Sequence, residues 1–165
     1  MRWLIDGYNV IRRDPDLRSR EAESLEAGRK ALLALVAGIA RDSSDHFTVV
    51  FDGARAGRAA PGGGRVQVVF SRPPASADDV LVRLAGECGD GAVVVTSDRA
   101  VGDRARRARC AVLGAEEFLS GAAGEGAERE EDDGDDRERP KRGNPHRLSK
   151  AERAARRALR RLQRP

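Results

Sequence analysis

The sequence is poor in the side chains that bind soft metals or cross-link a fold. It holds two cysteines and two histidines in 165 residues. Cys88 and Cys110 fall on separate predicted elements, without the spacing or the neighbouring histidines of a zinc site. The pattern therefore argues against zinc binding and against a disulfide framework, and we interpret both cysteines as buried free thiols.

Long apolar runs are also missing. No stretch approaches the roughly 18 apolar residues that a membrane-spanning helix needs, and the first acid, Asp6, comes too early for a secretory signal peptide. We therefore expect a cytoplasmic protein with no membrane partner. With 39% hydrophobic residues, the chain is long enough for one core, which predicts a single domain with an appendage.

Charge is balanced over most of the chain and segregated near its end. Residues 1–120 carry 18 basic and 17 acidic side chains, a net charge of +1. Residues 125–138 then hold nine acids against two arginines, whereas 140–165 hold ten basic side chains against one acid. A final segment of net charge +9 predicts a polyanionic partner.

Strands and helices are predicted to alternate through the first 120 residues. Nearly continuous apolar runs at 47–51 and 92–97 are typical of strands covered on both faces. Residues 21–41 have apolar side chains at helical spacing. Further strands and helices are expected at 65–70, 76–88, 99–109, 111–113 and 115–119. This alternation predicts an α/β fold with a mainly parallel sheet.

The predicted domain ends near residue 120. From 121 to 148 the chain is dense in charge and poor in apolar residues, which predicts a disordered linker. Ser149 and Glu152 match a helix-capping pattern before a run rich in alanine, arginine and leucine. We therefore expect a domain at 1–120, an acidic-to-basic linker at 121–148 and a basic helical tail at 149–165.

Aspartates follow three of the predicted strands. Asp6, Asp52 and Asp98 each come directly after an apolar run, and Asp78 stands in the first turn of the helix predicted from Ser76. The carboxyl ends of parallel strands meet at one crevice, where crowded carboxylates repel one another unless a cation neutralises them. Oxygen ligands suit Mg²⁺, which activates water for attack on a phosphate. The sequence therefore predicts metal-dependent phosphodiester hydrolysis.

Plainer explanations exist for the same residues. An aspartate before a glycine is often only a turn residue. Asp79 and Asp103 also fit a favourable helix dipole and a solvated helix face, and Asn9 and Ser97 also fit a turn and a helix cap. The coincidence on three strands favours the catalytic interpretation, in which these four side chains support the site.

Four motifs, taken in order, resemble a known family. They are Leu-Ile-Asp-Gly-Tyr-Asn-Val-Ile at 4–11, Val-Val-Phe-Asp-Gly at 49–53, Ala-Asp-Asp at 77–79 and Val-Thr-Ser-Asp at 95–98. Over residues 1–120 the chain resembles the NYN domain, a branch of the PIN-like nucleases, and specifically its bacterial YacP-like group. The resemblance implies a PIN-like three-layer α/β/α fold, dependence on Mg²⁺ or Mn²⁺, and endoribonuclease activity.

The resemblance also implies roles for single residues. Asp6, Asp78 and Asp98 match the family's metal-binding acids, and Asp52 matches a recurrent acid of less defined catalytic part. The group includes a ribosome-associated messenger RNA nuclease, so RNA and the ribosome are the implied partners. The acidic and basic tail is a departure that does not map onto the family's motifs.

Arginines are placed to hold RNA in two regions. The first, the loop at 53–64 and its flank, is expected to contact phosphates through Arg55, Arg58, Arg65 and Arg72. The second is the tail, interpreted as an RNA- or ribosome-binding arm outside the catalytic fold, with Arg153, Arg156, Arg157, Arg160 and Arg161 on its surface. The corresponding alternatives are a solvated connecting loop and an inert solubilising tail.

Two other functions compete with RNA cleavage. Phosphatases and phosphotransfer receiver domains rely on a lysine near the phosphoryl group, but Lys30, Lys141 and Lys150 follow no late strand. The second alternative is a non-catalytic RNA-binding or ribosome-associated protein that retains the fold and uses its basic tail. The four acids argue against it, because an inactive descendant has no reason to keep a repulsive cluster.

Overall fold

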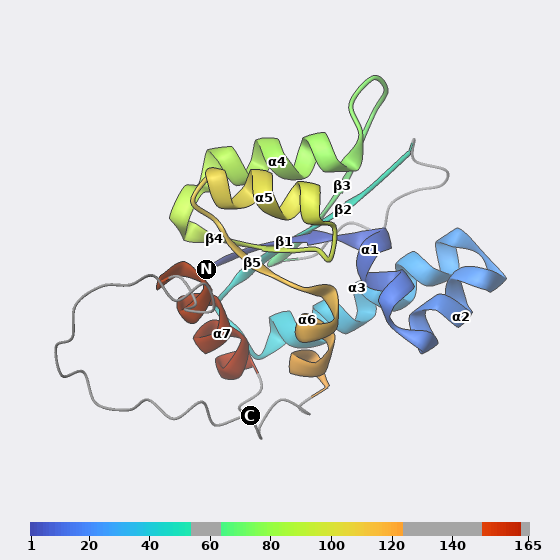
Figure 1. Cartoon of the computed structure of the whole chain (residues 1–165). Coiled ribbons are helices and arrows are strands. Elements are labelled where there is room, and N and C mark those ends of the chain that lie inside the picture. The colour runs from blue at the N-terminus through green and yellow to red at the C-terminus, as the bar shows by residue number, and fades with distance from the viewer. Residues whose placement is uncertain (54–63, 124–149, 163–165) are drawn as a thin grey trace, which may run out of the picture.

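The computed structural model describes residues 1–53, 64–123 and 150–162, which contain one five-stranded sheet (Figure 1). The strands are β1 (Arg2–Asp6), β2 (His46–Phe51), β3 (Val66–Phe70), β4 (Ala92–Val95) and β5 (Ala111–Leu113). Their order is β3-β2-β1-β4-β5, and all neighbouring strands are parallel. The predicted α/β fold is confirmed, with a sheet that is parallel throughout rather than mainly parallel.

Helices cover both faces of the sheet. They are α1 (Gly7–Arg13), α2 (Pro15–Glu23), α3 (Leu25–Arg41), α4 (Ala77–Cys88), α5 (Arg99–Arg107), α6 (Ala115–Ala122) and α7 (Lys150–Leu162), with a 3-10 turn, η1 (Gly89–Gly91), before β4. α4 and α5 lie on one face, whereas α1, α3 and α6 lie on the other (Figure 1). These three layers are the arrangement that the family resemblance implied.

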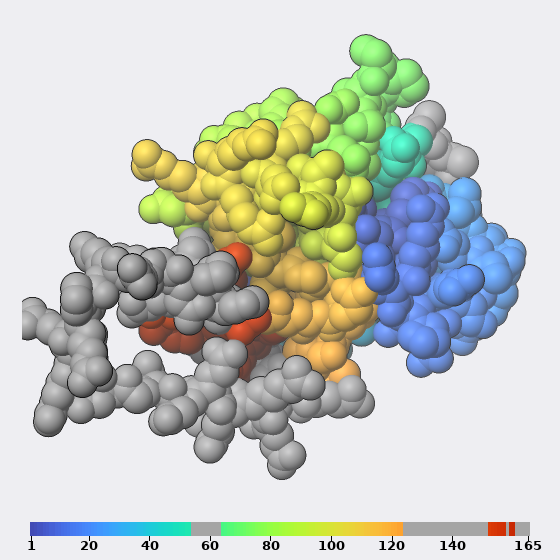
Figure 2. All heavy atoms as spheres, in the orientation of Figure 1, coloured from blue at the N-terminus to red at the C-terminus, as the bar shows by residue number. Residues whose placement is uncertain are grey.

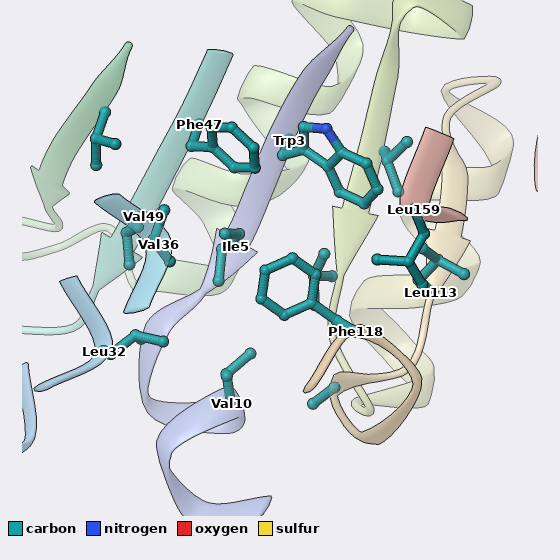
Figure 3. Close-up of a cluster of buried hydrophobic side chains, with 14 of the residues drawn as sticks. Trp3, Ile5, Val10, Leu32, Val36, Phe47, Val49, Leu113, Phe118 and Leu159 are labelled. Carbon is teal, nitrogen blue, oxygen red and sulfur yellow. The ribbon is translucent and has the colours of Figure 1, made fainter. Parts of the chain in front are cut away.

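Each face of the sheet has its own core, because neighbouring residues of a strand point to opposite sides. Trp3 and Ile5 of β1 pack in the larger cluster, where the Trp3 ring lies 6.1 Å from that of Phe47 and 6.0 Å from that of Phe118 (Figure 3). Leu4, between them in sequence, packs against α4 and α5 on the opposite face. Burial on both faces explains the nearly continuous apolar runs.

The first crossover differs from the single helix predicted at 21–41. The chain leaves β1 at Asp6 and enters α1 directly, and α2 begins at Pro15, before the start of the predicted helix. Ser24 then ends α2 and caps α3, because its side chain accepts a hydrogen bond from the amide of Ala27. A serine that bonds the following backbone favours a helix start over a helix interior. The predicted helix is therefore two helices.

The helix predicted from Ser76 is confirmed. The Ser76 hydroxyl accepts from the amide of Asp79, and the Asp79 carboxylate accepts from the amide of Ser76. This reciprocal cap fixes the entry into α4 and places Asp78 in its first turn. Of the two thiols, Cys110 is buried and Cys88 half-buried, and both are free. Among the described helices, none is long and apolar enough to cross a membrane.

α7 packs on the domain instead of standing apart from it. Ala155 and Leu159 are buried in the larger core, where Figure 3 shows Leu159 near Leu113, and α7 contacts β5 and α6. Leu159 sits against Gly121, where an added Cβ would lie 2.6 Å from Leu159 Cγ. The interpretation of the tail as an arm outside the fold does not account for this packing, because a narrow apolar stripe is hidden among the arginines. Most of the linker predicted at 121–148 lies outside the described residues.

Candidate active site

The site is built at the point where the sheet topology reverses. β1 is the central strand, and the chain adds β2 and β3 on one side of it and β4 and β5 on the other. In open parallel sheets, ligands bind in the crevice beyond the carboxyl ends of the strands at such a point. Asp6 ends β1 and Asp98 opens α5 after β4, so the two carboxylates belong to this edge.

Asp6 is a buried carboxylate held by neutral donors. It is 8% exposed, and its two oxygens accept from the amide of Asn9 at 3.2 Å and from the Thr96 hydroxyl at 3.1 Å. Burial raises the pKa of Asp6, the charges of Asp78 and Asp98 raise it further, and the two hydrogen bonds oppose the rise. Asp6 therefore bears a charge that its surroundings disfavour.

Thr96 joins the first and the fourth strands at this edge. Its hydroxyl donates to Asp6 and accepts from the amide of Asp98 at 3.1 Å. The Asp98 carboxylate in turn caps α5 by accepting from the amide of Val101 at 3.0 Å. The alternative interpretation of Ser97 as the helix cap is not what the structure shows, because Asp98 provides the cap. Thr96 instead links the Asp6 carboxylate to the backbone at Asp98.

Asp78 enters the same group from α4. Burial raises its pKa most, and the charges of Asp98, Asp79 and Asp52 raise it further, against the attraction of Arg104. Asp6 is thus influenced by the charges of Asp78 and Asp98, and Asp78 by those of Asp98 and Asp52, so the four acids lie within electrostatic range of one another. Asp52 is held by Ser71, whose hydroxyl donates to it at 2.6 Å and accepts from the amide of Gly53 at 3.2 Å.

A hydrogen-bond chain behind the acids ties three loops together. The Asn9 side chain accepts from the amide of Ser97 at 2.8 Å, and the Ser97 hydroxyl donates to Glu116 at 2.6 Å. Glu116 also pairs with Arg13 at 2.9 Å. Asn9 and Ser97 thus lie where a supporting role needs them. Glu116, which the sequence analysis missed, was marked only by its position just after a buried strand.

The other two expected supporting acids have local partners. Asp79 caps α4 and pairs with Arg104 at 3.6 Å, and hydrogen bonds from Ser76 lower its pKa. Asp103 pairs with Arg99 and Arg106 on the exposed surface of α5. Asp103 is not part of the acidic group, and its place on a solvated helix face explains its charge.

Comparison with known proteins assigns the chain to a family. The sequence pattern of the YacP-like NYN domain matches residues 3–161. The chain belongs to the YacP-like NYN domain family. The match includes α7, beyond the range 1–120 over which the motifs resemble the family. This family is one of PIN-like nucleases.

Solved structures agree with this family membership. The crystal structure of Rae1 (YacP) from Bacillus subtilis matches this chain with a TM-score of 0.62. The two sequences are 26% identical, and the match covers 74% of each chain. A point mutant of the same Bacillus subtilis protein gives a TM-score of 0.63 at the same identity and coverage. Among proteins with curated functional descriptions, none matches this sequence significantly.

The arginines expected to bind RNA fall in three places. Arg55 and Arg58 lie outside the described residues. Arg65 precedes β3 and donates to the carbonyl of Ser43, at the amino edge of the sheet and thus opposite the acids. The structure does not place Arg65 beside the crevice, since residues before a parallel strand stand at its other end. Arg72 is exposed just after β3, at the carboxyl edge.

The arginines of α7 divide by helix face. Arg153, Arg157 and Arg160 are exposed, as spacings of four and three residues on the outer face of a helix require. Arg156 is half-buried and pairs with Glu117 of α6 at 2.7 Å. The side chain of Arg161 lies outside the described part of the structure. α7 therefore packs by one face and presents basic groups on another.

The acidic group fits a divalent cation chemically. Within residues 1–53, 64–123 and 150–162, no three His, Cys, Asp or Glu side chains are close enough to hold one ion directly. Mg²⁺ commonly takes only one or two carboxylates and keeps several waters. The raised pKa values of Asp6 and Asp78 show that the site favours neutralisation of its charge. A hydrated Mg²⁺ or Mn²⁺ ion satisfies both conditions.

Proposed function

We propose that this chain is a metal-dependent endoribonuclease that hydrolyses RNA phosphodiester bonds at the carboxyl edge of its sheet. Asp6, Asp78 and Asp98 are the residues that would hold Mg²⁺ or Mn²⁺. The observation that carries the proposal is the burial of Asp6 near the like charges of Asp78 and Asp98 at the topological switch point, within a family of PIN-like nucleases.

The protein side chains have distinct tasks in this proposal. A bound divalent ion activates water and stabilises charge on the phosphate. Thr96 and the amide of Asn9 keep Asp6 oriented, and Thr96 also holds the backbone at Asp98. Asp52, fixed by Ser71, is assigned a supporting role that acts through ordered water. Arg72 and the outward arginines of α7 would attract the RNA backbone.

The substrate proposed is messenger RNA engaged with the ribosome. This part rests on the family resemblance and on the exposed Arg153, Arg157 and Arg160, which form a basic surface on α7. Basic residues on one helix face contact phosphates by releasing counterions from the nucleic acid. A non-catalytic RNA-binding role would use the same arginines but leaves the repulsive acids without a purpose.

A nuclease assay on the full chain tests the proposal. We expect cleavage of single-stranded RNA in Mg²⁺ or Mn²⁺, loss of cleavage in EDTA, and loss in an Asp6→Asn, Asp98→Asn double variant that still binds RNA. Metal-independent cleavage would contradict the assignment of the acids. RNA binding without cleavage in either metal, with and without ribosomes, would instead favour the non-catalytic role.

A further inference from the structure

A pocket of about 340 Å³ adjoins the acidic group on the side of α7. It is lined by Thr96, Ser97 and Asp98 of the loop after β4, and by residues of α6 and α7. In the space-filling view, α7 lies next to the surfaces of α5 and α6 (Figure 2). A ligand in this pocket would therefore touch both the candidate active site and the C-terminal helix.

The pocket has an apolar base and a polar rim. Val112 and Leu113 of β5 line its base together with Gly102 of α5. A Cβ on Gly102 would lie 3.5 Å from Val112 and 3.4 Å from the Arg106 guanidinium, so a larger residue would fill the space where these groups meet. A flat, mostly apolar group suits such a base, provided that its edges form hydrogen bonds.

Two arginine–glutamate pairs form the rim. Arg106 pairs with Glu152 at 3.5 Å, and Arg156 pairs with Glu117 at 2.7 Å. Their side chains are between 23% and 50% exposed, so each pair presents donors and acceptors to a ligand. Charge is balanced among the lining side chains, with Arg99, Arg106 and Arg156 against Asp98, Glu117 and Glu152. A balanced rim favours a neutral ligand over a phosphate.

We propose that this pocket receives an unpaired nucleobase of the RNA, from the nucleotide next to the scissile phosphate. The proposal rests on the proposed function, because Asp98 belongs both to the acidic group and to the pocket wall. Proteins read single-stranded RNA by stacking splayed bases on flat side chains, including guanidinium planes, and by bonding to base edges. The pocket then sets which base stands beside the cut, and α7 contributes to substrate choice.

Cleavage mapping on a single-stranded RNA pool, randomised around the cut, tests this assignment in the full chain with Mg²⁺. We expect the parent to prefer one base at one flanking position, and Arg156→Gln and Glu117→Gln to reduce that preference about tenfold. Arg156→Lys retains a charge for the ion pair but loses the planar group, so it should lose preference without losing stability. The matched controls Arg83→Gln and Glu87→Gln remove an exposed pair on α4 that lines no part of this pocket, and should keep the preference.

Two results would overturn the base pocket. The first is an unchanged preference in all three pocket variants. The second is an equal loss of rate for all four bases, which would indicate contact with the backbone instead of a base.

A binding measurement separates this proposal from the nuclease assignment. With no metal present, at least one of the four nucleosides should shift the amide resonances of Gly102 and Gly114, whereas inorganic phosphate should not. Arg156→Gln should weaken the binding of that nucleoside about tenfold, and Arg83→Gln should leave its affinity unchanged. If the parent shows these nucleoside-specific shifts but cleaves no RNA, the result supports the base pocket and contradicts the proposed function. Absence of shifts up to about 10 mM of every nucleoside would overturn the pocket even in an active nuclease.

Discussion

The carboxylates at the two edges of the sheet differ in the charges that surround them. At the amino edge, Asp45 accepts from the Met1 ammonium at 2.6 Å and from the Trp3 indole at 2.9 Å, so its charge has a cationic partner. At the carboxyl edge, the donors that Asp6 has among the described residues are neutral, the amide of Asn9 and the Thr96 hydroxyl, while Asp78 and Asp98 repel it. The same residue type pairs with a cation of the protein at one edge and lies among like charges at the other, where the proposed metal ion would neutralise it.

This difference separates a structural acid from a functional one. A carboxylate whose ion pair closes within the fold contributes to stability and has no need of a ligand. A carboxylate that is buried among like charges costs stability, which a bound metal ion recovers. Comparing variants at the two edges therefore distinguishes the two roles, with activity as the readout at one edge and stability at the other.

The largest expected effect is on catalysis at the carboxyl edge. Asp6→Asn and Asp98→Asn should each lower the rate of RNA cleavage in Mg²⁺ by about 10²- to 10³-fold, since each removes charge that holds the ion. Asp52→Asn should lower the cleavage rate less, by about tenfold to a hundredfold, because Asp52 is assigned a supporting role. Asp45→Asn is the matched control at the amino edge and should keep its rate. Parent-like cleavage by both Asp6→Asn and Asp98→Asn would refute the comparison.

The next effect concerns α7 and the stability of the domain. Leu159→Ala should lower the free energy of unfolding by about 2–3 kcal/mol, because it leaves a cavity beside Gly121 in the larger core. Leu25→Ala is the control, since Leu25 is 54% exposed. The buried Trp3, the single tryptophan, reports unfolding in urea by its fluorescence. Equal midpoints for the two variants would restore the interpretation of α7 as a separate arm.

The fold was largely predictable, because the buried strands have a clear sequence pattern. Strands buried on both faces leave continuous apolar runs such as 47–51, and their alternation with helices permits few topologies. The packing of α7 was not predictable in the same way. Among the side chains of α7 that the structure describes, Ala155 and Leu159 are the buried ones, so net charge concealed a contact made by apolar residues that stand among arginines.

The candidate site was predictable in its acids and less so in its supports. An aspartate that follows an apolar run has a position that the strand itself fixes, which is why Asp6 and Asp98 were found. Ser71 and Glu116 act through contacts with residues distant in sequence, which no local pattern records. Arg65 was predicted to lie beside the acids at the carboxyl edge. It directly precedes β3 and therefore lies at the amino edge instead.

A smaller loss of stability is expected at the amino edge. Asp45→Asn should lower the free energy of unfolding by about 1–2 kcal/mol, because it weakens charged hydrogen bonds to Met1 and Trp3. The loss corresponds to a few degrees in Tm for a chain of this size. Asp42→Asn, three residues earlier on the surface, is a control for the change of charge. A Tm equal to that of the parent would mean that the closed ion pair contributes nothing.

The smallest effect is a gain of stability at the carboxyl edge, and its pH dependence has a definite sign. Because the pKa of Asp6 is raised in the folded chain, the native state binds a proton more readily than the unfolded state. Stability is therefore lost as pH rises from the unfolded value, near 3.8, through the folded value. Asp6→Asn removes this loss, so without metal its Tm should exceed that of the parent at pH 7, and the difference should vanish below about pH 4. Millimolar Mg²⁺ should raise the Tm of the parent more than that of Asp6→Asn, since the ion relieves a repulsion that the variant lacks. A metal-free Tm of Asp6→Asn below that of the parent at pH 7 would show that the two hydrogen bonds to Asp6 outweigh its burial, and would make Asp6 a structural acid like Asp45.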